Sequence, residues 1–208
     1  MTPQRKTLPS KSPAPRAWQR MLSGRRLDLL DPSALDIEIE DIAHGLSRLA
    51  RWNGQTSGKW AFSVAQHCLL VEHIANRLSQ ENNPALSLAG LLHDAAAYVI
   101  GDLISPFKAA VGIDYKAFEA NLLRAIHMRF GLPAIMPEQA AKLIKRADRI
   151  AAYYEATQLA GFSQRDTLKY IGRPGRIAGI ELAPWPPGIA KTRYLARFGA
   201  LSKAMAKK

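Results

Sequence analysis

The stretch PALSLAGLLHDAAAYV, residues 84–99, decides the fold. Its residues are almost all apolar, so we expect one helix that is buried on every side in the centre of a core. Pro84 suits the first helical position, where a missing N–H costs no hydrogen bond. The pair His93 and Asp94 interrupts the apolar run. Because polar groups are expensive to bury without a partner, this pair marks the helix as more than a packing element.

Helical spacing continues on both sides of this stretch. Apolar residues recur at intervals of three and four over residues 39–49, and Ser63 with Gln66 forms a capping box at the start of another helix. Two further helices are expected to begin near residues 114 and 137. No segment of strand length alternates between polar and apolar residues. The sequence therefore predicts an all-α, single-domain fold.

Positive charge gathers at the two ends of the chain. The 208 residues carry a formal charge of +12, and 13 of the 29 Lys and Arg residues lie in 1–26 and 186–208, which hold no acidic residue. Residues 27–185 are nearly neutral, with 16 basic residues against 17 acidic ones. We predict a basic, disordered or loosely packed extension at 1–26 and a helical core at 27–160. An irregular loop followed by a basic amphipathic helix that packs on the core is predicted for 161–208.

Composition limits the classes of function. A hydrophobic content of 48% is typical of globular proteins, and one cysteine excludes a disulfide framework. No run of residues is long and apolar enough to span a membrane, so no membrane partner is expected. With no apolar leader segment, we expect a cytoplasmic protein. The basic ends favour either solubilising tails or binding to nucleic acid.

Four polar residues fall on helix faces that should be buried. His67 shares its stripe with Leu70 and Ile74, Asp148 lies on the apolar side of the helix after residue 137, and His93 and Asp94 interrupt the most apolar helix. Each residue alone has an ordinary structural explanation, such as a hydrogen bond in the core. Two imidazoles and two carboxylates that converge from three helices instead suit one divalent ion of Zn, Mn, Co, Fe or Mg.

At these residues the sequence resembles the HD-domain metal-dependent phosphohydrolases, in which a histidine precedes a His-Asp pair and a later lone aspartate. The resemblance extends to the small bacterial 5′-deoxynucleotidases of the YfbR-like group and to related phage deoxynucleotide triphosphohydrolases. The matching segments keep the family's order over about 110 residues: AHGLSR (43–48), RW (51–52), SVAQH (63–67), HDA (93–95), GDLISPFK (101–108), YKAFE (115–119) and KRADRIAAY (145–153).

This resemblance implies a role for each matching residue. His67, His93, Asp94 and Asp148 would bind the metal ion. Arg51 would contact the substrate phosphate, with Trp52 beside the nucleoside and Lys108 and Lys116 as further phosphate contacts. Asp102 would act at the scissile phosphate, where it could orient water or protonate the leaving oxygen. The implied partner is a nucleotide substrate, and related proteins are often homodimers.

One position departs from the family pattern. Ala97 stands where the family has a glutamate that could hold the attacking water. Three explanations are open: Asp102 suffices alone in a slower enzyme, the chain is a non-catalytic relative that still binds metal and nucleotide, or Ala97 replaces a natural glutamate. The function classes that follow are a metal-dependent hydrolase of nucleotide 5′-phosphates, a pseudo-hydrolase, and a basic nucleic-acid-associated protein.

Overall fold

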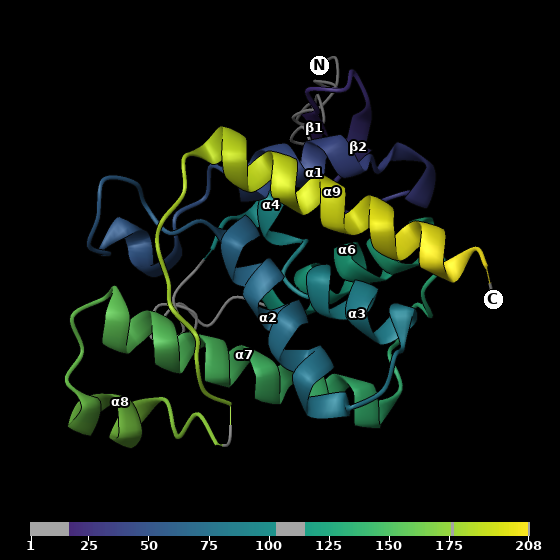
Figure 1. Ribbon diagram of the computed structural model, residues 1–208. Coiled ribbons are helices and arrows are strands. Elements are labelled where there is room, and N and C mark those ends of the chain that lie inside the picture. Colours follow the sequence, from purple (N-terminus) through teal and green to yellow (C-terminus); the bar gives the residue numbers. More distant parts are fainter. Residues whose placement is uncertain (1–16, 103–114, 176, 208) are drawn as a thin grey trace, which may run out of the picture.

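The computed structural model describes residues 17–102, 115–175 and 177–207. The prediction of an all-helical fold is confirmed, and two short strands are a minor addition (Figure 1). In chain order the elements are β1 (Trp18–Arg20), β2 (Arg26–Asp28), η1 (Ala34–Asp36), α1 (Ile39–Leu46), η2 (Arg51–Gly54), α2 (Val64–Ser79), α3 (Pro84–Leu91), α4 (Ala97–Ile100), α6 (Tyr115–Arg129), α7 (Glu138–Gln158), α8 (Gln164–Tyr170) and α9 (Pro187–Met205).

Helix α2 lies at the centre of the bundle and packs against α3, α7 and α9 (Figure 1). Its first turn has the cap that the sequence predicts, because the Ser63 hydroxyl accepts a hydrogen bond from the Gln66 N–H at 3.3 Å. Gly90 of α3 allows a close crossing, since a Cβ there would lie 3.4 Å from the Glu72 Cα. The core therefore forms around both sides of α2.

The predicted continuous helix over residues 84–99 is wrong. Helix α3 ends at Leu91, residues 92–96 form turns, and α4 begins at Ala97. In a regular helix, His93 and Asp94 would diverge by about 100°. The turns remove that restriction, so both side chains can face the same point beside α2. The break thus serves the placement of the two polar residues.

The strands β1 and β2 form a hairpin that holds residues 18–28 against α1. Trp18 pairs with Asp28, and Ser23 in the connection donates from its N–H and its hydroxyl to the buried Asp41 carboxylate at 2.9 and 2.5 Å. The sequence predicted no strand at residues 18–28, because three-residue strands are too short to show polar and apolar alternation. Gly24 supplies the left-handed conformation that the turn needs, with φ at +96°.

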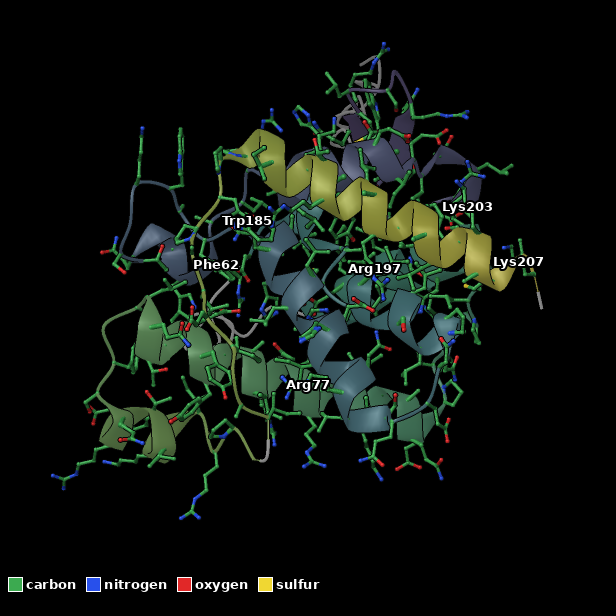
Figure 2. All side chains as sticks on the ribbon, in the orientation of Figure 1. Phe62, Arg77, Trp185, Arg197, Lys203 and Lys207 are labelled. Atoms are coloured by element: carbon green, nitrogen blue, oxygen red, sulfur yellow. The ribbon has the colours of Figure 1, made fainter. Side chains whose placement is uncertain are left out.

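An extended strap, residues 177–186, connects the α8 region to α9 and is held by two glutamines. Gln158 of α7 and Gln66 of α2 each donate to one strap carbonyl and accept from one strap N–H, at 2.8 to 3.0 Å. These side-chain amides replace the backbone pairing that a neighbouring strand would supply. Trp185 lies near the end of the strap, just before α9 (Figure 2).

Helix α9 covers the side of the bundle formed by α1, α2 and α3. Tyr194 is fully buried, and its hydroxyl donates to the Leu91 carbonyl at 3.1 Å. Arg197 reaches the buried Glu72 carboxylate at 2.5 Å (Figure 2). Helix α8, capped by Ser163, forms within the region that the sequence analysis expected to be irregular. The division of the chain at residues 26 and 160 stays a prediction.

Among the described residues, no helix combines the length and apolar character needed to cross a membrane.

Candidate metal centre

Three segments of the bundle bring the predicted ligands together. His67 lies in the first turn of α2, and Asp148 lies in the middle of α7, which packs along α2. His93 and Asp94 come from the break between α3 and α4. Because α2 packs tightly against α3 and α7, the backbone positions of all four residues are fixed relative to one another.

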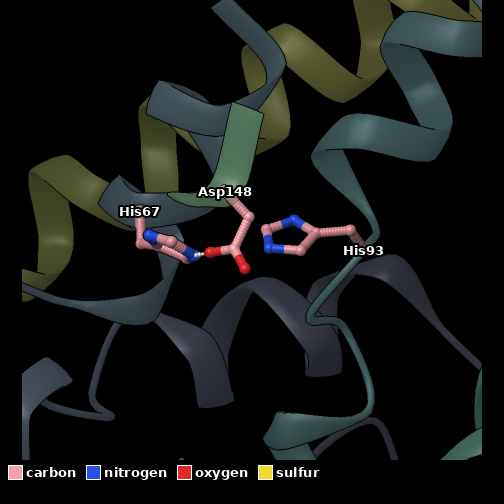
Figure 3. Close-up of side chains that lie close together, drawn as sticks. All are labelled: His67, His93 and Asp148. Atoms are coloured by element: carbon pink, nitrogen blue, oxygen red, sulfur yellow. Dashed lines mark ion pairs between the residues drawn. The ribbon is translucent and has the colours of Figure 1, made fainter. Parts of the chain in front are cut away.

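The ligand atoms of His67, His93 and Asp148 all lie within 4.8 Å of one another. The Asp148 carboxylate lies between the two imidazoles in Figure 3, and its Oδ1 is 3.2 Å from the His67 Nε2. Asp94 joins them, because its Oδ2 lies 3.5 Å from the Nε2 atoms of both histidines. The structure thus brings all four predicted metal ligands to one point.

The two imidazoles each direct one nitrogen to a hydrogen-bond acceptor and leave the other without one. The His67 Nδ1 lies 2.6 Å from a Glu155 carboxylate oxygen, and the His93 Nδ1 lies 2.9 Å from the Gly90 carbonyl. Both Nε2 atoms are buried and have no hydrogen-bond partner among the described residues. Metal-binding histidines have this arrangement, in which the outer nitrogen is anchored and the inner one is left for the ion. The residues therefore fit a divalent cation.

The charges around this point also fit a cation. Four carboxylates, those of Asp94, Asp102, Asp148 and Glu155, lie near a single guanidinium, that of Arg51. Burial raises the pKa of Asp148, but the adjacent His67, whose Nε2 lies 3.2 Å from its carboxylate, lowers that pKa well below the ordinary range. Excess negative charge in a partly buried place is a strong reason to expect bound positive charge.

Burial by itself lowers the pKa of His67, and the nearby Arg51 lowers it further. The carboxylates of Glu155 and Asp148 outweigh both effects and raise this pKa to about 10. In the metal-free chain the imidazole thus keeps a proton at neutral pH. A divalent cation would replace that proton at the Nε2 atom.

Glu155 is a part of this site to which the sequence analysis gave no role. Its side chain is fully buried, and it contacts the His67 Nδ1 at 2.6 Å, the Trp52 indole N–H at 2.9 Å and the Arg51 Nε at 3.3 Å. Burial raises the pKa of Glu155, but His67 and Arg51 lower it to about 2, so the carboxylate is charged. The sequence signal was its place on the buried stripe of Asp148, seven residues later.

Arg51 and Asp102 form an ion pair next to this cluster. The Arg51 Nη1 donates to both carboxylate oxygens of Asp102 at 3.2 and 3.1 Å, while the Nε bonds Glu155. Although burial opposes the charge, Glu155 and Asp102 raise the pKa of Arg51 well above its ordinary value. The guanidinium is therefore held, always charged, between the ligand-supporting carboxylate and the predicted catalytic one.

Trp52 takes an uncommon backbone conformation. It and Asn53 have φ values of 56° and 51°, in the left-handed region that non-glycine residues rarely adopt. The hydrogen bond to Glu155 and a ring contact with Phe162, at 5.5 Å between centroids, hold this turn. Strained backbone that is held on several sides often accompanies a functional site.

The remaining predicted residues lie around the cluster or outside the described chain. Ala97 is buried at the start of α4, directly after the break that carries His93 and Asp94. Lys116 is exposed on α6. Lys108 lies outside the described residues. The roles predicted for Ala97, Lys108 and Lys116 stay predictions.

The HD domain matches residues 64–153 of the chain, which include all four candidate ligands. An uncharacterised protein of Rhodobacter capsulatus is 49% identical over 192 residues, covering 91% of this chain and 98% of its own length. The chain belongs to the HD-domain family. The uncharacterised protein YfdR of Escherichia coli is a more distant relative, 30% identical over 168 residues, covering 81% of this chain and 86% of its own.

Membership of the HD-domain family agrees with the geometry of the cluster. HD domains bind divalent metal ions, and the superfamily consists of metal-dependent phosphohydrolases. Three of the residues that hold the centre together, His67, His93 and Asp148, come from separate segments of the matched region. The resemblance stated from the sequence is therefore confirmed for the HD-domain superfamily.

Proposed function

We propose that this chain hydrolyses the 5′-phosphate of nucleotides or deoxynucleotides with one divalent metal ion. The supporting observation is the convergence of His67, His93, Asp94 and Asp148, with two buried Nε2 atoms that lack a hydrogen-bond partner among the described residues. When bound there, a divalent ion polarises a phosphate oxygen and activates a water molecule. The YfbR-like 5′-deoxynucleotidases provide the proposed substrate class.

Arg51 is the residue best suited to bind the substrate phosphate. It keeps its charge at any working pH, and its contacts with Asp102 and Glu155 use the Nε and Nη1 atoms. A guanidinium presents five donors in a planar fork, so its outer edge can bind a phosphate oxygen while the inner edge stays anchored. Arg51 would then neutralise charge on the phosphate as the bond to the 5′-oxygen breaks.

Asp102 would orient the attacking water and accept its proton. Its carboxylate accepts two hydrogen bonds from the Arg51 Nη1, at 3.2 and 3.1 Å, which fix its direction. A positioned carboxylate of this kind contributes about 10²–10⁴ to a rate. In the family pattern a glutamate at position 97 shares this task, so we expect the chain to turn over slowly with Ala97.

The test combines metal analysis with a phosphate-release screen. The metal-reconstituted chain and its Ala97→Glu variant are assayed with nucleoside 5′-mono- and triphosphates. We expect metal-dependent release of phosphate from the monophosphates, or of inorganic triphosphate from the triphosphates, by the variant, and a slower release or none by the parent chain. Hydrolysis that continues after metal removal would contradict the proposal, and so would a metal-loaded variant that is inactive on every nucleotide.

The second candidate is a pseudo-hydrolase that binds metal and nucleotide without turnover. The observation in its favour is Ala97, which begins α4 directly beside the His93–Asp94 break and carries no carboxylate. If the Ala97→Glu variant binds nucleotide as the parent does and gains no activity, this candidate replaces the first. Homodimer formation and nucleic-acid binding by the basic ends stay predictions.

A further inference from the structure

A hollow of about 590 Å³ lies between α6 and α7 and borders the candidate metal centre. We call it the α6–α7 hollow. His93 and Asp148 form its inner end, and aliphatic side chains form most of its described walls. Among these wall residues are Ala120, Leu123, Met136, Ala141 and Ile144. A cavity of this size and character is typical of sites for small organic molecules.

The hollow lies on the side of the histidines where a bound phosphate would be. The two nitrogens of an imidazole point away from each other, and in His67 the Nδ1 faces Glu155 while the Nε2 faces Asp148. Trp52 donates to Glu155, so its indole N–H lies on the Nδ1 side. His93 and Asp148 belong both to the ligand cluster and to the lining of the hollow, so a phosphate bound on the Nε2 side would have the α6–α7 hollow next to it.

The polar residues of the hollow suit an anionic ligand. Lys145 is one turn before Asp148 on α7, and Arg124 extends from α6 on the opposite wall. Asp148, which belongs to the candidate metal centre, is the one acidic residue on the described part of the lining. Cations that line an apolar cavity attract an anionic ester, and the aliphatic walls remain for its apolar part.

We infer that the α6–α7 hollow binds the nucleoside of the substrate, with the 5′-phosphate at His93 and Asp148 and the base against the aliphatic walls. This inference rests on the proposed function for the choice of a nucleotide. It assigns a binding site to Ala141, Ile144, Lys145 and Arg124, to which the sequence analysis gave no role in binding the nucleoside. The predicted contact of Trp52 with the nucleoside is the competing arrangement.

The experiment measures binding rather than turnover, because the Ala97 chain is expected to hold substrate with little reaction. Isothermal titration calorimetry of the metal-reconstituted chain gives the Kd for deoxyadenosine 5′-monophosphate and for deoxyribose 5-phosphate, which lacks the base. The test variant is Ala141→Phe, which adds a ring inside the hollow. The matched control is Gln139→Phe, an exposed position two residues earlier on α7 that faces elsewhere.

We expect Ala141→Phe to weaken binding of the nucleotide about tenfold or more, because the added ring occupies the space of the base. Binding of deoxyribose 5-phosphate should change less than about twofold, and Gln139→Phe should change neither ligand. This pattern supports the hollow even if no variant releases phosphate, in which case the proposed hydrolysis fails by itself. A Lys145→Gln variant should weaken both ligands, more at low salt than at high salt.

Two results would overturn the inference. One is an Ala141→Phe variant that binds the nucleotide as the parent does. The other is a Trp52→Leu variant that loses the preference for the nucleotide over deoxyribose 5-phosphate while Ala141→Phe keeps it. Circular dichroism of each variant shows whether it has folded, and an unfolded Ala141→Phe chain is replaced by Ala120→Phe on the facing wall.

Discussion

Glu72 and His67 are buried on different sides of helix α2, and they differ in how many of their hydrogen bonds the protein supplies. Glu72 faces α9, where Arg197 donates to both of its oxygens at 2.5 and 3.1 Å and Asn76 adds a further hydrogen bond. His67 faces α7, where Glu155 satisfies the Nδ1 while the buried Nε2 has carboxylates nearby but no hydrogen-bond partner in the described chain. Helix α2 therefore carries one buried polar cluster whose hydrogen bonds are made and a second in which a buried nitrogen lacks a partner among the described residues.

The difference separates a structural role from a functional one. A buried charge with all its hydrogen bonds made holds helices in register, and a ligand would add nothing to it. A buried nitrogen that lies beside two carboxylates and has no hydrogen-bond partner costs free energy in the metal-free protein. Binding of a cation removes this cost, because the nitrogen becomes a metal ligand. We therefore expect substitutions on the α7 side to change metal binding and those on the α9 side to change stability.

The largest effect is expected for His67→Ala. The variant loses a ligand that no neighbouring side chain can replace, so metal content after dialysis should fall from about one ion per chain to almost none. Inductively coupled plasma mass spectrometry measures this content. His73→Ala, on the exposed side of the same helix, is the matched control and should keep its metal. A folded His67→Ala chain that retains stoichiometric metal would rule out the centre.

The positions of His67 and Asp148 could be predicted because each depends on local periodicity, which places a residue on the buried face of its own helix. The break between α3 and α4 could not be predicted in this way. The turns at residues 92–96 replace a helix that Ala95, Ala96 and Ala97 favour individually, since tertiary packing overrides weak helix propensity.

The role of Glu155 could not be predicted for a different reason. Spacing within α7 puts it on the stripe of Asp148, but its partners Arg51, Trp52 and His67 come from segments about 90 to 100 residues earlier in the chain. Helical periodicity carries no information about which distant segment packs on which face. The fold class therefore follows from the sequence more readily than the supporting contacts of the site.

On the α7 side of α2, a smaller effect on metal binding is expected for Glu155→Gln. The amide keeps the size of the side chain but removes the charge that anchors His67, Arg51 and Trp52 together. Substitutions of residues that orient a metal-binding histidine typically cost about 10–100-fold in metal affinity. Competition with a chelating dye measures the Kd of the metal. Glu138→Gln, at the exposed start of α7, serves as the control, and an unchanged Kd for Glu155→Gln would remove Glu155 from the centre.

On the α9 side, Arg197→Met should lower stability and leave metal binding unchanged. The substitution leaves the buried Glu72 with one hydrogen-bond partner fewer, but the Arg197 side chain is 39% exposed, which weakens the pair. We expect a loss of about 1–3 kcal/mol in urea unfolding of the metal-free chain. Lys203→Met, at an exposed position of the same helix, should be neutral (Figure 2). If the metal affinity falls together with the stability, the polar clusters on the two sides of α2 are coupled and do not have separate roles.

The smallest effect concerns pH and the metal-free chain. His67 faces Glu155 and Asp148 from α7, Asp94 from the break and Arg51 from η2, and the carboxylates raise its pKa from 6.5 to about 10. A raised pKa contributes stability that is complete below pH 6.5 and lost as the pH rises through about 10. Differential scanning fluorimetry in the presence of a chelator should therefore show the Tm declining over this range.

Two controls assign that alkaline decline to His67. The His67→Ala variant lacks the imidazole and should not show this part of the decline. The metal-loaded chain should not show it either, because the ion takes the place of the proton at the Nε2 atom. If all three samples decline in parallel, the decline comes from groups outside the cluster, and the carboxylates around His67 do not hold a proton there at neutral pH.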